Sequence, residues 1–99
     1  MADIDAARRA LIARILDGEG DASRAQRRAA FDNAGEPRAL IDKVARHAAR
    51  VGDDDFAAAR AAGLTEDQLF ELTICAAVGE ANRQYEAALA ALDAADKGA

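Results

Sequence analysis

"LTEDQLFELTICAAVGEANRQYEAAL", residues 64–89, contains the strongest local structural signal in the chain. Thr65 followed three residues later by Gln68 is a capping box, in which each side chain bonds the backbone N–H of the other residue at the start of a helix. Leu64 and Leu69 occupy the two positions of a hydrophobic staple, which packs the incoming chain against the first turns. The sequence therefore predicts a helix that begins at about residue 65.

Apolar residues continue along this helix to about residue 93. They are Leu69, Leu72, Ile74, Ala76, Ala77, Val78, Ala81, Tyr85, Ala88, Leu89 and Leu92. Between residues 69 and 78 they cover more than one helical face, whereas a helix on a monomer surface shows a single apolar stripe. We therefore expect this part of the helix to be enclosed, with a second subunit covering it.

Four shorter helices are predicted before it, and each is followed by a glycine. Their approximate ranges are residues 3–17, 22–33, 37–51 and 53–62. The first has Asp3 as its N-cap and an apolar stripe made of Ile4, Leu11, Ile12, Ile15 and Leu16. The third opens with Pro37, whose missing N–H costs nothing in a first turn, and its predicted buried face is Leu40, Ile41, Val44, Ala48 and Val51. The fold class is an all-α helical bundle of about five helices with a long C-terminal helix.

The length of 99 residues fits one domain. We divide this single domain into N-terminal helices (1–35) and a core (37–92). Its large apolar residues are few, because Leu, Ile, Val and Phe together number 19 while alanine numbers 29. Alanine favours helices and lets them approach closely, but it buries little area. We therefore expect a thin core and association into a homo-oligomer or with a protein partner.

The net charge of −5 argues against nucleic-acid binding, which depends on many Lys and Arg side chains. The single cysteine, Cys75, rules out an internal disulfide and a cysteine-based zinc site. We expect no metal and no cofactor. The absence of a long apolar run and of a secretory leader predicts a cytoplasmic protein without membrane contact.

Two charged clusters have both a structural and a functional interpretation. Arg24, Arg27 and Arg28 form a basic patch that would suit an acidic partner, but we favour a solvated helix face, because exposed charges usually contribute little. The run Asp53–Asp55 offers carboxylates for a metal ion, but it lacks the spaced ligands of a calcium loop. We favour capping of the helix that follows, because carboxylates stabilise a helix start.

The segment "DDDFAAARAAGLTEDQLFELTICAAVGEANRQYEAAL", residues 53–89, resembles part of the AhpD-like, or carboxymuconolactone decarboxylase-like, superfamily. Members show the pattern HT-x-x-A-x-x-x-G-x-[ST]-x-x-[EQ]-[IL] followed by a long apolar helix, and the resemblance extends over residues 37–92. It implies an all-α bundle that assembles as a dimer, trimer or hexamer through its long helices.

The redox motif of that superfamily is missing. Its C-x-x-C-x-x-x-H positions, counted back from Gly63, correspond here to Ala48, Val51 and Asp55. A disulfide reductase or peroxidase needs one thiolate to attack and a second thiol to resolve the intermediate. The resemblance therefore implies a non-redox member, and we lean against an enzyme.

Three groups remain as weak catalytic candidates. Cys75 lies among apolar residues near Glu71, where burial and a carboxylate both raise a thiol pKa, so we interpret it as core. His47 is the only histidine, and we favour a structural role for it over catalysis. A pair with Glu71 or Glu80 on the long helix is the catalytic alternative.

Four residues of the long helix are candidates for a subunit interface: Gly79, Cys75, Arg83 and Tyr85. A glycine inside a strong helix costs about 1 kcal/mol relative to alanine, so Gly79 indicates a close approach between helices. Two functions follow. The first is a non-redox helical protein that acts through self-association or a protein partner. The alternative is a small carboxymuconolactone decarboxylase-like enzyme or ligand-binding protein that uses His47 with Glu71 or Glu80.

Overall fold

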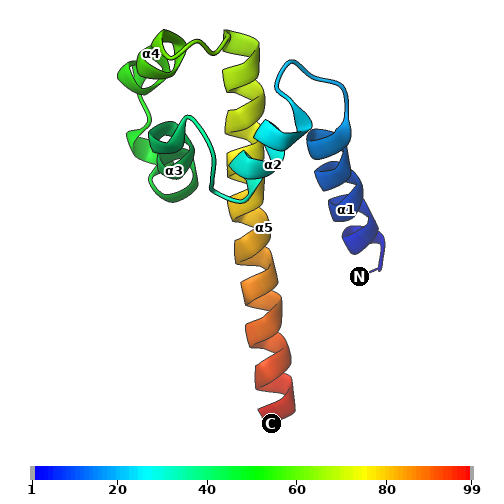
Figure 1. Cartoon of the computed structure of the whole chain (residues 1–99). Coiled ribbons are helices and arrows are strands. Elements are labelled where there is room, and N and C mark those ends of the chain that lie inside the picture. Colours follow the sequence, from blue (N-terminus) through cyan, green and yellow to red (C-terminus); the bar gives the residue numbers. More distant parts are fainter. Residues whose placement is uncertain (1, 99) are drawn as a thin grey trace.

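The computed structural model describes residues 2–98, and this part of the chain contains helices and no strands. The elements are α1 (Ala2–Asp17), α2 (Arg24–Phe31), α3 (Arg38–Arg46), the short 3-10 helix η1 (Ala48–Arg50), α4 (Asp53–Ala61) and α5 (Glu66–Gly98). Helix α5 is the axis of the molecule, and the other helices pack against only its first half (Figure 1). The predicted all-α fold with a long C-terminal helix is confirmed.

Helix α5 begins with the predicted capping box. The Thr65 hydroxyl oxygen accepts the Gln68 N–H at 3.1 Å, and the Gln68 side-chain oxygen accepts the Thr65 N–H at 2.9 Å. Leu64 is half-buried against the core and Leu69 is buried, as a hydrophobic staple requires. The helix continues to Gly98, past the predicted end near residue 93.

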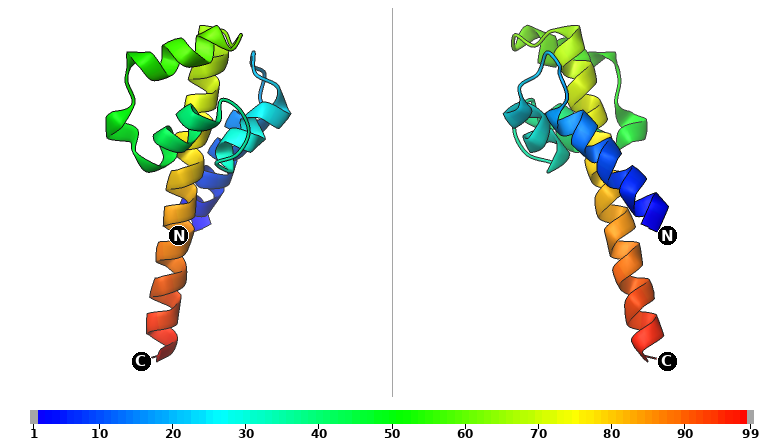
Figure 2. Two further views of the ribbon diagram at one scale, coloured as in Figure 1. Left: turned by 60° about the vertical axis from the view of Figure 1, so that its left-hand side comes forward. Right: turned by 90° about the vertical axis from the view of Figure 1, so that its right-hand side faces the viewer.

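The core lies where α2 and α3 pack on the same side of α5. Its buried residues are Leu16, Ala22, Ala30, Phe31, Leu40, Ile41, Val44, Ala59, Leu69, Leu72, Cys75 and Ala76. Helix α1 lies beside α5 and runs in the opposite direction (Figure 2). Its predicted stripe is only partly buried, because Leu16 enters the core whereas Ile4 and Leu11 remain about half exposed. The enclosure predicted for residues 69–78 is only partial, because helices of the same chain bury Leu69, Leu72, Cys75 and Ala76 whereas Phe70 and Ala77 stay exposed.

The third predicted helix is shorter than its sequence pattern indicated. Helix α3 ends at Arg46, and His47 leaves the helical conformation with φ −142° and ψ 47°. Beyond it, the Asp55 carboxylate accepts the Gly52 N–H at 2.9 Å and the Lys43 ammonium at 3.1 Å. These bonds hold the start of α4 against α3, so the chain must turn instead of continuing straight. The prediction that Ala48 and Val51 extend this helix was therefore wrong, and Ala48 is exposed, but Val51 is half-buried against the core as expected of a packing residue.

The basic patch predicted around helix α2 does not exist as a unit. Ser23 and Gln26 form a capping box at the start of α2, with N···O distances of 3.0 and 2.8 Å. Arg24 and Arg28 are exposed, but Arg27 is only 5% exposed. Its Nη1 donates to the carbonyl oxygens of Ile15 at 3.1 Å and Gly18 at 2.6 Å. Arg27 therefore caps the C-terminal end of α1, where the helix dipole favours a cation.

The molecule is elongated, with extents of 54 × 28 × 18 Å. The last turns of α5 project beyond the other helices as a free rod (Figure 2). None of the helices in residues 2–98 combines the length and the apolar character that crossing a membrane requires.

Candidate functional site

The predicted catalytic pairs are not formed. His47 is exposed at the end of α3, where its backbone N–H donates to the Lys43 carbonyl oxygen at 2.7 Å. Glu71 accepts the backbone N–H groups of Asp21 at 2.8 Å and Ala22 at 3.3 Å, and so holds the loop between α1 and α2. Glu80 pairs with Arg83 at 2.9 Å. Both carboxylates therefore bind groups other than His47.

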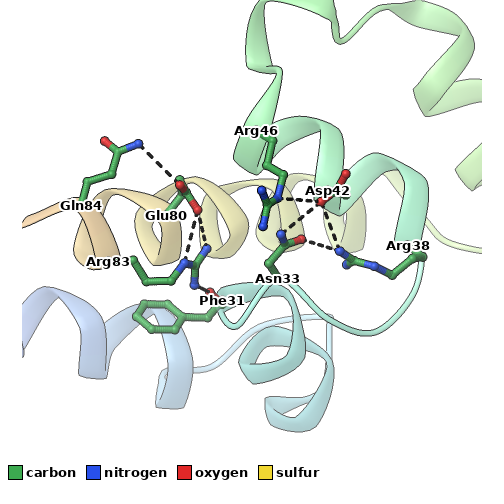
Figure 3. Close-up of polar contacts among 8 residues, drawn as sticks. All are labelled: Phe31, Asn33, Arg38, Asp42, Arg46, Glu80, Arg83 and Gln84. Atoms are coloured by element: carbon green, nitrogen blue, oxygen red, sulfur yellow. Dashed lines mark hydrogen bonds and ion pairs between the residues drawn. The ribbon is translucent and has the colours of Figure 1, made fainter. Parts of the chain in front are cut away.

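Glu80 and Arg83 belong to a contact between α5 and the end of α2 (Figure 3). Arg83 Nη1 donates to the Phe31 carbonyl oxygen at 2.6 Å while its other nitrogens bond Glu80. That oxygen belongs to the last residue of α2, so Arg83 satisfies a carbonyl that has no partner within its helix. Arg83, predicted at a subunit interface, joins two helices of one chain.

A second polar cluster in Figure 3 connects the turn after α2 to α3. Asn33 has a left-handed backbone, with φ 56°, which short polar side chains adopt more readily than most. Its amide nitrogen donates to Asp42 at 3.1 Å, and its side-chain oxygen accepts Arg38 at 2.7 Å. Asp42 also pairs with Arg46 at 3.3 Å. These side chains hold the turn, and their exposed ion pairs add little stability.

Gly79 is the point of closest approach between α5 and α2. A Cβ atom placed on it would lie 2.7 Å from the carbonyl carbon of Phe31 and 2.9 Å from its Cα. Gly79 is buried, and the atoms nearest to it belong to Phe31 at the end of α2 in the same chain. The close approach inferred from the sequence is thus real, but its assignment to a subunit interface was wrong because α2 occupies the position.

Cys75 belongs to the core, as predicted. Its side chain is 1% exposed. Burial raises the pKa of the Cys75 thiol, and the Glu71 carboxylate adds to this effect more weakly, against a lowering influence of Arg27. A thiol with a raised pKa is a poor nucleophile at neutral pH, since the thiolate is the reactive form. Cys75 is therefore neither a reactive centre nor an exposed interface residue.

Tyr85 is half-buried where the start of α1 lies along α5. The guanidinium carbon of Arg8 lies 5.1 Å from the centre of the Tyr85 ring, within cation–π range. Arg8 Nη1 also donates to the Asn82 side-chain oxygen at 2.6 Å. Tyr85, predicted at a subunit interface, therefore contacts α1 of the same chain and is half-buried.

The two most exposed large apolar residues lie on one face of α5, whereas the exposed Ile4 and Leu11 belong to α1. Phe70 is 66% exposed and Leu92 is 60% exposed. Between them, Ala77, Ala81 and Ala88 are also exposed. At 3.6 residues per turn, the other four side chains project within about 40° of the direction of Phe70. We call the surface formed by these five residues the open face. It faces away from both α2 and α3, whose contacts with α5 involve Leu72, Ala76 and Gly79.

Two shallow hollows flank the open face. The first, of about 230 Å³, lies between α4 and the start of α5 and is lined by Phe56, Arg60, Glu66, Leu69, Phe70 and Thr73. The second, of about 200 Å³, lies between α1 and α5 and is lined by Arg8, Leu11, Ile12, Val78, Ala81, Asn82 and Tyr85. Phe70 and Ala81 thus belong both to the open face and to a hollow. The hollows beside the face could therefore accept side chains of a binding partner.

The sequence prediction did not include Phe70 among the apolar positions of this helix. Phe70 directly follows the buried Leu69, and a step of one residue rotates a side chain by about 100° away from the core. Leu92 was among the predicted apolar positions, and the other three members are alanines, which occur on every face of this helix. The available signal was the heptad-like spacing of Ala77, Ala81 and Ala88, which becomes informative only once the buried face is known.

No protein-family model matches the chain, and no curated protein and no solved structure matches it either. The AhpD-like resemblance therefore stays a prediction.

Proposed function

We propose that this protein is a non-redox helical association module whose open face on α5 binds a second copy of the chain. The observation that carries the proposal is the exposure of Phe70 and Leu92, at 66% and 60%, on the face that the chain's own helices leave uncovered. A large apolar side chain contributes about 1.5–3 kcal/mol when it is fully buried. Because Phe70 and Leu92 are mostly exposed in the folded chain, most of this burial free energy is still available for binding a partner.

A second copy is the favoured partner because the surface suits helix-to-helix packing. Alanines between two large residues let helix axes approach to about 8 Å, the short end of the usual range. The free end of α5 extends beyond the chain's own helices, so it is accessible to another molecule (Figure 1). Assembly through long helices is also what the AhpD-like resemblance implies, and we include that ancestry in the proposal.

The enzyme alternative has less support. Glu71 holds the loop before α2 and Glu80 holds Arg83, so neither carboxylate is arranged to polarise His47. At the positions of the superfamily redox motif, Ala48 is exposed in η1 and Asp55 is paired with Lys43. We therefore place the function in binding.

Sedimentation equilibrium of two matched variants tests the proposal. Leu92→Ser removes a large side chain from the open face, whereas Leu89→Ser makes the same change on the same projecting turns but off that face. We expect Leu92→Ser to weaken self-association about tenfold or more, since each 1.4 kcal/mol corresponds to a factor of ten. Leu89→Ser should change it by less than about threefold. Equal effects of the two substitutions, or a wild-type protein that stays monomeric at the highest attainable concentration, would refute the proposal.

A further inference from the structure

We infer that residues 19–22 form a strap that opens separately from the rest of the fold and controls access to the buried thiol of Cys75, with the Glu71 side chain holding it closed. The strap lies in the loop between α1 and α2, beside the first turns of α5 (Figure 1). It shares no residue with the open face, so its opening is independent of self-association.

Both ends of the strap are fixed by contacts that do not involve α5. Before it, the Gly18 N–H donates to the Arg14 carbonyl oxygen at 3.0 Å, and the Gly18 carbonyl oxygen accepts Arg27 at 2.6 Å. After it, Ser23 and Gln26 form the capping box that starts α2. A helix end whose backbone groups are satisfied by its own cap does not need the loop beyond it. Helices α1 and α2 can therefore stay in place while the strap moves.

The strap itself is held mainly by one side chain of α5. The Glu71 carboxylate accepts the N–H groups of Asp21 at 2.8 Å and Ala22 at 3.3 Å. A longer contact joins Gln68 Nε2 to the Asp21 carbonyl oxygen at 3.4 Å. Of the four strap residues only Ala22 is buried, and an alanine side chain contributes little area. Hydrogen bonds to a charged group are stronger than neutral ones, so Glu71 supplies most of the attachment.

Gly20 shows how closely the strap lies against Glu71. A Cβ atom placed on Gly20 would overlap Glu71 Oε1 and lie 3.0 Å from its Cδ. These atoms form the free end of a flexible side chain, so an added methyl group would displace the carboxylate and leave the helices where they are. The contact can therefore be broken from the strap as well as from α5.

Opening of the strap gives access to Cys75. A hollow of about 450 Å³ lies between α1, the strap and α5, and Cys75 is among its lining residues. Glu19 and Gly20 line the same hollow from the strap. The Cys75 side chain is only 1% exposed, and its Sγ lies 3.8 Å from the Ile15 carbonyl oxygen. When the strap moves away, one wall of the hollow is lost and a small reagent reaches the sulfur.

This opening exposes far less surface than unfolding of the domain. Local openings occur at a lower free energy than global unfolding when they break few contacts. Urea distinguishes the two, because its effect on an equilibrium scales with the surface exposed. Labelling of the thiol through the open strap should be nearly independent of urea below the unfolding transition. Labelling through global unfolding should instead rise about fivefold or more per molar urea.

Reaction of Cys75 with N-ethylmaleimide under native conditions tests the inference. Glu71→Gln and Gly20→Ala both weaken the contact that holds the strap, and each should react at least about tenfold faster than wild type, with little dependence on urea. Glu80→Gln, which removes a charge from the same helix, and Gly52→Ala, where nothing lies within 4 Å of the new atom, are the matched controls. Both should stay within about threefold of wild type.

Three results would overturn the inference. Wild-type rates in both Glu71→Gln and Gly20→Ala would show that Glu71 does not hold the strap closed. Faster reaction that rises steeply with urea would show that Cys75 is reached only when the whole domain unfolds. Loss of the fold in both variants, seen by circular dichroism, would show that the strap belongs to the same cooperative unit as the helices.

Discussion

Substituting Gly79 by alanine should destabilise the fold, although alanine is the better helix former. The new Cβ would lie 2.7 Å from the Phe31 carbonyl carbon and 2.9 Å from its Cα, where about 3.5–4.0 Å is the ordinary separation. These are backbone atoms, so no side-chain rotation relieves the overlap and α2 must move by about 1 Å. The displacement also strains the Arg83 bond to the Phe31 carbonyl, now 2.6 Å long.

The size of the effect follows from two opposing contributions. Overpacking a buried site costs about 1–3 kcal/mol, and the backbone contact places Gly79→Ala at the upper end. Helix propensity returns about 1 kcal/mol. We therefore expect a net loss of about 2 kcal/mol in the free energy of unfolding, which lowers the melting temperature of a domain of this size by roughly 8–16 °C.

Thermal unfolding followed by circular dichroism measures this loss. Gly98→Ala is the matched control, because it makes the same change in the same helix with nothing within 4 Å of the new atom. It should alter stability by no more than about 0.5 kcal/mol. A Gly79→Ala protein as stable as wild type would show that α2 does not press on α5 at this point.

Three further predictions concern other groups. Arg27→Met should lower the free energy of unfolding by about 2–3 kcal/mol, because two charge-assisted hydrogen bonds to the end of α1 are lost. Urea unfolding measures this loss, and the exposed control Arg24→Met should differ from wild type by no more than about 0.5 kcal/mol. Cys75 should react with a thiol reagent on the order of 100-fold more slowly in the native protein than in urea, since burial blocks access and raises its pKa; equal rates would contradict the buried position. The Gly52 N–H and then Lys43 lower the pKa of Asp55 below its ordinary 3.8, so the stability it adds is complete above that pH and is lost as pH falls through the lower native value. The difference in melting temperature between wild type and Asp55→Asn should therefore close on acidification, and a constant difference would refute the assignment.

Much of the local structure was readable from the sequence because it depends on neighbouring residues. The capping box at Thr65 and Gln68 acts within one turn, so its geometry was predictable without tertiary contacts. The predicted end of the third helix failed because Lys43 and Gly52 both bond Asp55, and no local pattern encodes that turn. The core position of Cys75 was predictable from the apolar residues around it.

The candidate site was less predictable, because an alanine occurs equally on buried and exposed helix faces and so does not indicate which face it will lie on. Ala76 is buried under α2 and α3 whereas Ala77 is exposed on the open face, and only the packing separates them. Arg27 illustrates the same limit for charge. Its neighbours Arg24 and Arg28 are exposed, yet Arg27 turns toward the end of α1 and is buried.

The sequence by itself determined that this chain is helical, where its longest helix begins, and that its large apolar residues are too few for a thick core. These properties depend on composition and on contacts within a turn or two, which the order of residues specifies directly. Only the tertiary structure decided that Gly79 receives α2 of the same chain and that Phe70 and Leu92 stay uncovered. Those outcomes depend on which helix packs against which face of α5, and that choice involves residues far apart in the sequence.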